Sequence, residues 1–143
     1  MTRRDERGST SLLIIGLAVV ALMLVAVVVD ASAAYLRRTG LETLADGAAL
    51  AAADGIHGRQ VYRGGLGERA RLDPAVARRY VEAYLTASGA ARRYPGLRYD
   101  VEVGVDRVVV RVASPLDLPL TAPGFDTSAM VTGTAASFVV VTN

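Results

Sequence analysis

The chain has 143 residues, a formal net charge of +2 and 52% hydrophobic residues. This length allows one membrane span and one small domain with a single modest core. The small charge excess argues against a nucleic-acid partner. Because the sequence contains no cysteine, disulfides, thiolate metal sites and catalytic thiols are excluded.

The longest apolar stretch is Leu12–Val29, 18 residues without a charge. As a helix rising about 1.5 Å per residue it spans roughly 27 Å, close to the hydrocarbon thickness of a bilayer. Its Leu, Ile and Val residues favour insertion by at most about 4 to 8 kcal/mol, and Asp30 at its end costs less than about 3 kcal/mol. We therefore predict a transmembrane helix over residues 12–34.

Residues 1–11 precede this helix as a short basic tail, in which Ser9, Thr10 and Ser11 are candidate N-caps. We expect the tail to be a cytoplasmic anchor, which the excess of arginine before the span favours only weakly. A secretory signal peptide is the alternative, because Ala31-Ser32-Ala33 fits a small-residue cleavage site. The apolar run is longer than that of most signal peptides, and the helical pattern continues through the site.

Beyond the span, apolar residues recur at helical spacing through residues 35–54, with Gly55 at the predicted C-terminus. Gly40 lowers helix propensity and marks a site for a bend. The alanine-rich stretch Ala48–Ala53 has a thin surface, which favours close approach of a sheet or a second helix. The alternative is that alanine serves here only as a strong helix former.

This N-terminal part resembles the TadE/TadG-like family of Tad (Flp) pilus-assembly proteins. The resemblance covers about residues 7–54 and lies in the Arg7-Gly8-Ser9 start, the apolar run Leu12–Val29, the pair Val29-Asp30, Tyr35 and the alanine-rich Leu41–Ala53. It implies a bacterial membrane-anchored component of a pilus or secretion apparatus. The N-terminus would be cytoplasmic, the C-terminal domain outside, and the partners would be the membrane and other subunits.

Pilins of this kind are typically cut after the glycine and carry Glu at the fifth mature position. Cleavage between Gly8 and Ser9, the candidate processing site, would place Leu13 there. A buried carboxylate can neutralise the amino terminus of a neighbouring subunit, and this chain lacks it. The resemblance therefore implies an accessory or minor subunit, with Asp30 and Tyr35 as candidate assembly contacts.

Residues 55–143 are expected to form a small extracytoplasmic domain. Residues 55–72 are rich in Gly and Arg and predict a loop. Asp73-Pro74 then begins a helix that Gly89 ends. Its apolar face combines two rows of residues at i, i+4 and i+8, and its two tyrosines are expected in the core: Val76, Tyr80 and Tyr84; Ala77, Val81 and Leu85.

Alternating patterns predict two strands at residues 97–105 and 108–112. A turn centred on Val105-Asp106 keeps the valines on one face and pairs Asp100 with Arg111 as opposite charges. Three prolines make residues 114–126 a crossing loop. Residues 129–141 predict a last strand, with its small residues suited to contact the alanine-rich helix and with one side formed by Met130, Thr132, Thr134, Ala136 and Phe138.

These elements predict an α+β fold, in which a long N-terminal transmembrane helix extends into a small domain with a second helix and about three antiparallel strands, a pilin-like plan. The sequence shows no nucleophile with a base, no metal-ligand spacing and no phosphate-binding loop. We expect a non-catalytic, single-pass membrane subunit with no cofactor, metal or small-molecule substrate. Two alternatives stay open: a membrane-tethered binding module unrelated to pili, and an exported soluble protein cleaved near Ala33.

Overall fold

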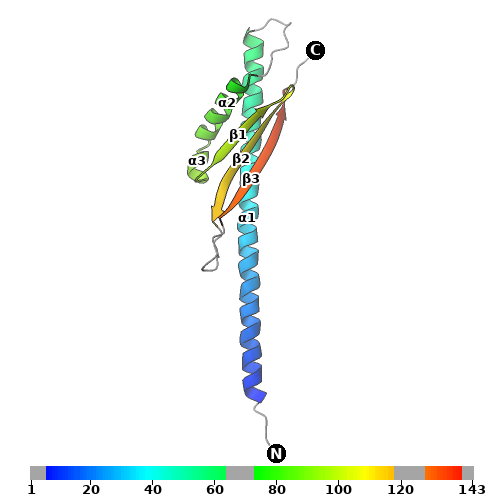
Figure 1. The fold of residues 1–143 in the computed structure, drawn as a ribbon, viewed down its shortest axis with the longest axis vertical. Coiled ribbons are helices and arrows are strands. Elements are labelled where there is room, and N and C mark those ends of the chain that lie inside the picture. Colours follow the sequence, from blue (N-terminus) through cyan, green and yellow to red (C-terminus); the bar gives the residue numbers. More distant parts are fainter. Residues whose placement is uncertain (1–5, 64–72, 118–127, 140–143) are drawn as a thin grey trace, which may run out of the picture.

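The computed structural model describes residues 6–63, 73–117 and 128–139. Its elements follow the order α1 (Glu6–Arg63), α2 (Pro74–Ala87), α3 (Ala90–Arg93), β1 (Arg98–Val103), β2 (Arg107–Asp117) and β3 (Ser128–Phe138). The three strands form one antiparallel sheet in the order β1-β2-β3. The sheet and α2 lie along the C-terminal half of α1, and the N-terminal half projects alone (Figure 1). The α+β prediction is confirmed.

Helix α1 is longer at both ends than the sequence pattern predicted. It begins at Glu6, so Ser9 to Ser11 lie inside the helix and the prediction that they cap it was wrong. The helix continues past its predicted C-terminus at Gly55 and ends at Arg63, so residues 55–63 are helical and not the start of a loop. The rest of the predicted loop, residues 64–72, lies outside the described part. The helix continues without a break through Gly40, and Figure 1 shows α1 as a straight rod without the predicted bend.

The core lies between one face of the sheet and the docked half of α1, with α2 covering the rest. Small residues on α1 are buried in this core, as the alanine-rich pattern predicted: Ala45, Ala48, Ala49 and Ala52. The inward valines of the central strand are fully buried opposite them: Val108, Val110 and Val112. Because alanine side chains are short, sheet and helix backbones approach closely without a void between them.

Helix α2 begins as predicted, with Asp73 as N-cap accepting a hydrogen bond from the backbone N–H of Ala75 at 2.9 Å. The chain leaves the helix through Gly89, whose φ of +65° lies in the left-handed region that glycine tolerates. One predicted row of α2 is buried: Ala77, Val81 and Leu85. The tyrosines of the other row pack against the core while staying partly exposed, which confirms the predicted apolar face.

The hairpin has the predicted register, since Val103 pairs with Val108 and Asp100 lies opposite Arg111. The prediction that Arg111 pairs with the Asp100 carboxylate was wrong. Arg111 forms its ion pair with Glu102, at 2.5 Å, which lies two residues along β1 on the same face as Asp100. A long arginine side chain reaches such a diagonal neighbour as readily as the residue directly opposite.

Strand β2 extends through Pro115 to Asp117, although the sequence predicted a loop from residue 114. The pairing explains how proline is tolerated in the central strand. The β1 pairing stops at Ala113, so only β3 borders this end of β2, which is locally an edge. The rest of the predicted crossing loop, residues 118–127, lies outside the described part.

Strand β3 ends at Phe138, and residues 140 and 141 of the predicted strand lie outside the described part. Its contact with α1 was predicted and is present, through the face that carries Gly133 and Ala135. The opposite face points away from the helices, so Met130 and Phe138 are exposed.

Candidate functional site

The N-terminal half of α1 carries a continuous exposed apolar surface. Each of the large hydrophobic side chains from Leu12 to Val29 is exposed, most by more than half. Within the described residues, α1 is the one helix long and apolar enough to cross a membrane, and its most apolar window has no buried residue. Exposed apolar surface on this scale requires an apolar environment, whether lipid or protein.

The candidate site residues from the sequence lie on this half of α1 and not in the domain. Gly8 and Ser9 are in its first turns. Tyr35 is 69% exposed, and Asp30 is partly exposed. Because Asp30 and Tyr35 are five residues apart, they lie about 140° apart around the helix. The structure therefore does not bring them to one face.

The docked half of α1 carries three glycines that each receive a tyrosine ring. The Tyr94 hydroxyl lies over Gly40, the Tyr84 hydroxyl over Gly47, and the Tyr80 ring over Gly55, where an added Cβ would lie 2.5 Å from three ring atoms. None of these glycines has a positive φ. Glycine is required there for space, since a methyl group would occupy the volume of the ring.

Arg37 joins α1 to the sheet at the point where the helix enters the domain. Its guanidinium donates to the Ser114 Oγ at 2.9 Å, to the Pro115 carbonyl at 3.2 Å and to the Arg93 carbonyl at 3.4 Å. The same group stacks over the Tyr94 ring, 4.7 Å from its centre. Three elements, α1, β2 and the end of α3, are thus tied together by one side chain.

Sequence reasoning missed this docking face. It took Gly40 as a weak point of the helix, whereas Gly40 and Gly47 lie seven residues apart on one face that α2 and the segment after α3 cover. Tyr84 and Tyr80 of α2 lie over Gly47 and Gly55 in reverse chain order, as antiparallel packing of α2 on α1 requires, and no spacing within α1 alone marks these glycines. No local pattern distinguishes Arg37 from its neighbour Arg38, which faces solvent and pairs with Glu42.

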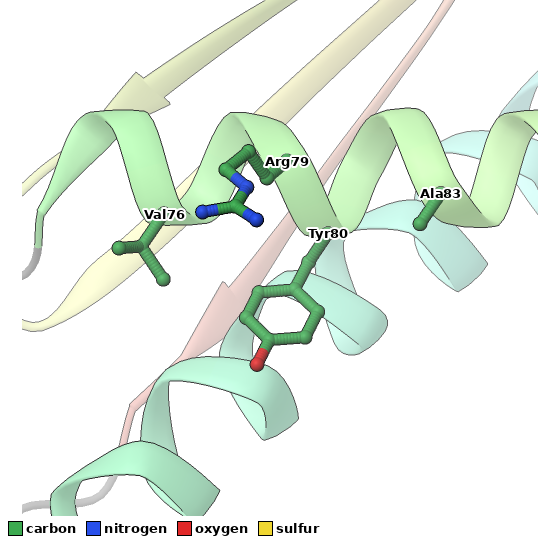
Figure 2. Close-up of a pocket in the computed structure, with 4 residues that line it drawn as sticks. All are labelled: Val76, Arg79, Tyr80 and Ala83. Carbon is green, nitrogen blue, oxygen red and sulfur yellow. The ribbon is translucent and has the colours of Figure 1, made fainter.

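A shallow depression lies on α2, lined by Val76, Arg79, Tyr80 and Ala83 (Figure 2). Its Tyr80 side chain points from α2 towards α1, so the depression is the outer rim of the helix–helix contact. Among the described residues, no cluster of three or more His, Cys, Asp or Glu could hold a metal ion.

Comparison with known families identifies the N-terminal segment. Residues 8–55 match the family model for Tad, putative Flp pilus-assembly TadE/G-like proteins. The matched segment, about a third of the chain, contains both the exposed apolar half of α1 and the glycine positions that receive the tyrosines. No curated protein and no solved structure matched the sequence. The resemblance expected from the sequence is confirmed over this Tad segment, which supports a pilus-related role.

Proposed function

We propose that this chain is a non-catalytic, single-pass membrane subunit, of the accessory or minor pilin-like kind, in a Tad-type pilus assembly or secretion system. The main support for the proposal is that α1, most of which matches the Tad family model, consists of two different halves. One half is apolar and exposed, and the other is docked on a sheet. The exposed half would lie in the membrane, with the N-terminus cytoplasmic and the α+β domain outside.

In this proposal the subunit works by lateral packing with other subunits and not by chemistry on a substrate. The apolar half offers Leu and Val surfaces without a small-xxx-small pair, so its packing against another helix is weak in isolation. Asp30 and Tyr35, on different faces just outside the apolar run, are the proposed assembly contacts. Gly8-Ser9 is the proposed processing site.

The test is the mass and N-terminal sequence of the mature protein in membrane and medium fractions, together with alkaline carbonate extraction. Full-length or Ser9-starting protein that resists carbonate supports the proposal, and co-purification with other pilus subunits then separates it from an unrelated tethered module. Protein that carbonate washes off in full-length form contradicts it.

Export with cleavage near Ala33 is the second candidate. The specific observation in its favour is that the described contacts of α1 with the domain lie beyond that site, at Arg37 and the glycine face. Cleavage would therefore leave the docked half of α1 in place. A soluble product that begins at Ala34 would establish this candidate instead.

A further inference from the structure

Five arginines gather where α1 enters the domain. Arg37 and Arg38 lie on α1, Arg92 and Arg93 on α3, and Arg98 starts β1. The hydrogen bond from Arg37 to the Arg93 carbonyl joins the helix to α3 at this level. The surrounding segments, residues 31–41 and 83–99, contain no Asp or Glu. This group is called the basic collar below.

The positive charge of the basic collar is largely unneutralised. Arg37 is held by neutral oxygens and a tyrosine ring, and in the part of the chain that the structure describes no carboxylate is among its hydrogen-bond partners. Among the described residues Arg92, Arg93 and Arg98 form no ion pair, and all three are exposed. Arg38 is paired with Glu42, which lies one turn further from the apolar half of α1.

The position of the collar along α1 indicates its partner. Arg37 lies eight residues past Val29, or about 12 Å along the helix, and about 5 Å past Ala34. The polar layer of a bilayer extends roughly 5 to 7 Å beyond the hydrocarbon on each side, so the backbone of Arg37 lies at or just outside this layer and its long side chain covers the remaining distance. In Figure 1, α3 lies at the end of α2 that is nearer the N-terminal half of α1, and the end of the β2–β3 pair reaches further in that direction.

We propose that the basic collar binds the headgroups of anionic phospholipids and thereby seats the domain on the membrane surface. This inference rests on the membrane insertion proposed above. The long arginine stems allow the guanidinium groups of Arg92, Arg93 and Arg98 to reach the lipid phosphates while their backbones stay in the domain. Basic residues close to an anionic surface are attracted to it in this way.

The test uses the full-length chain in bilayer discs of phosphatidylcholine with phosphatidylglycerol. The chain has no cysteine, so Ala91→Cys on the exposed side of α3 provides one labelling position. A fluorophore there is quenched by trace lipids labelled on the headgroup, either phosphatidylglycerol or phosphatidylcholine. The ratio of the two quenching efficiencies reports which lipid gathers at the collar.

We expect stronger quenching by phosphatidylglycerol, and a several-fold lower ratio in the Arg92→Gln/Arg93→Gln variant. Each basic residue near the surface contributes up to about fivefold to local enrichment, the equivalent of about 1 kcal/mol. The matched control is Arg78→Gln/Arg79→Gln on α2, which should leave the ratio unchanged. These two arginines lie about two turns before the end of α2, and α3 follows that end, so they are distant from Arg92 and Arg93.

Equal quenching by both lipids in the unsubstituted protein overturns the proposal, as does a ratio that the Arg92→Gln/Arg93→Gln variant leaves unchanged. Carbonate extraction of the same samples tests the membrane insertion of α1 separately from lipid binding by the basic collar. Protein that stays in the bilayer but shows a ratio of one contradicts only the lipid contact, whereas protein that is extracted contradicts the membrane insertion itself.

Discussion

Gly133 of β3 lies against the backbone of Leu41 on α1, so that a Cβ at Gly133 would be 2.5 Å from the Leu41 carbonyl carbon. At this crossing the sheet and the helix meet backbone to backbone, with Leu41 itself fully buried. A backbone cannot move aside as the end of a side chain can. This contact therefore sets how closely β3 rests on the helix.

Substitution of Gly133 by alanine should destabilise the docking of the sheet by about 1 to 3 kcal/mol, the usual cost of overpacking a core. The φ of Gly133 is not positive, so the effect arises from space and not from backbone strain. Near-ultraviolet circular dichroism of the core tyrosines, followed during thermal unfolding of the full chain in detergent, measures it. Thr134→Ala, on the exposed face of the same strand, is the control and should change the midpoint little.

Alanine at Gly55 and at Gly58 should change stability in opposite directions. Gly58 is exposed and has no atom within 4 Å of an added Cβ, so alanine there should stabilise α1 by up to about 1 kcal/mol. At Gly55 the Tyr80 ring occupies that space, and alanine should cost about 1 to 3 kcal/mol. Stabilisation by both substitutions in the same unfolding measurement would show that Tyr80 does not rest on Gly55.

Gly40 and Tyr94 should be strongly coupled. An added Cβ at Gly40 would meet the Tyr94 hydroxyl, whereas the next ring atom is 3.5 Å away, an ordinary contact distance. Gly40→Ala should therefore destabilise the protein, and adding Tyr94→Phe should restore most of the loss. A double-mutant cycle by denaturant unfolding should give a coupling energy of about 1 kcal/mol or more. Additive effects would contradict the contact.

Arg37→Lys should lower stability by about 1 to 3 kcal/mol, although it keeps the charge. Lysine cannot reproduce the forked hydrogen bonds to Ser114 and Pro115, so the buried Ser114 Oγ loses the donor from α1 and keeps the bond that it donates to the Pro95 carbonyl. The adjacent substitution Arg38→Lys is a matched control. Its exposed ion pair with Glu42 is worth only about 0.3 to 0.5 kcal/mol, so the two variants should differ clearly in unfolding midpoint.

Tyr99 should ionise at higher pH than an ordinary tyrosine. Its phenol donates a hydrogen bond to the Glu82 carboxylate at 2.7 Å, and this bond, followed by desolvation and the negative charge of Glu82, raises the pKa of Tyr99 above its usual 10.0. The folded state then holds the proton more tightly than the unfolded state. The resulting stability is fully present below about pH 10 and is lost as pH rises through the raised pKa.

Ultraviolet titration of the tyrosinate signal checks this, with Tyr99→Phe subtracted to isolate one residue among six tyrosines. Glu82→Gln should move the pKa of Tyr99 back towards its ordinary value. A difference curve that titrates at or below the ordinary pKa would contradict the hydrogen bond between β1 and α2.

The sequence predicted those local features that depend on neighbouring residues alone. The Asp73 cap, the apolar row of α2 and the parity of the Val105-Asp106 hairpin depend on periodicity and turn length alone, and each is as expected. The errors in the bounds of the elements lie at the ends of helices and strands. Strand β2 continues through Pro115 because β1 stops short of it, a fact about the neighbour and not about proline.

Composition and spacing were enough to predict the apolar half of α1 and the α+β class, because bulk hydrophobicity and regular periods are carried by the chain without reference to any contact. The Tad resemblance came from particular residues between Arg7 and Ala53. Tertiary packing alone revealed why Gly40, Gly47, Gly55 and Gly133 are glycines and why Arg37 differs from Arg38. In each case the reason is an atom from a distant segment, which either fills the neighbouring space or accepts a hydrogen bond, and no pattern within one helix or strand can reveal it.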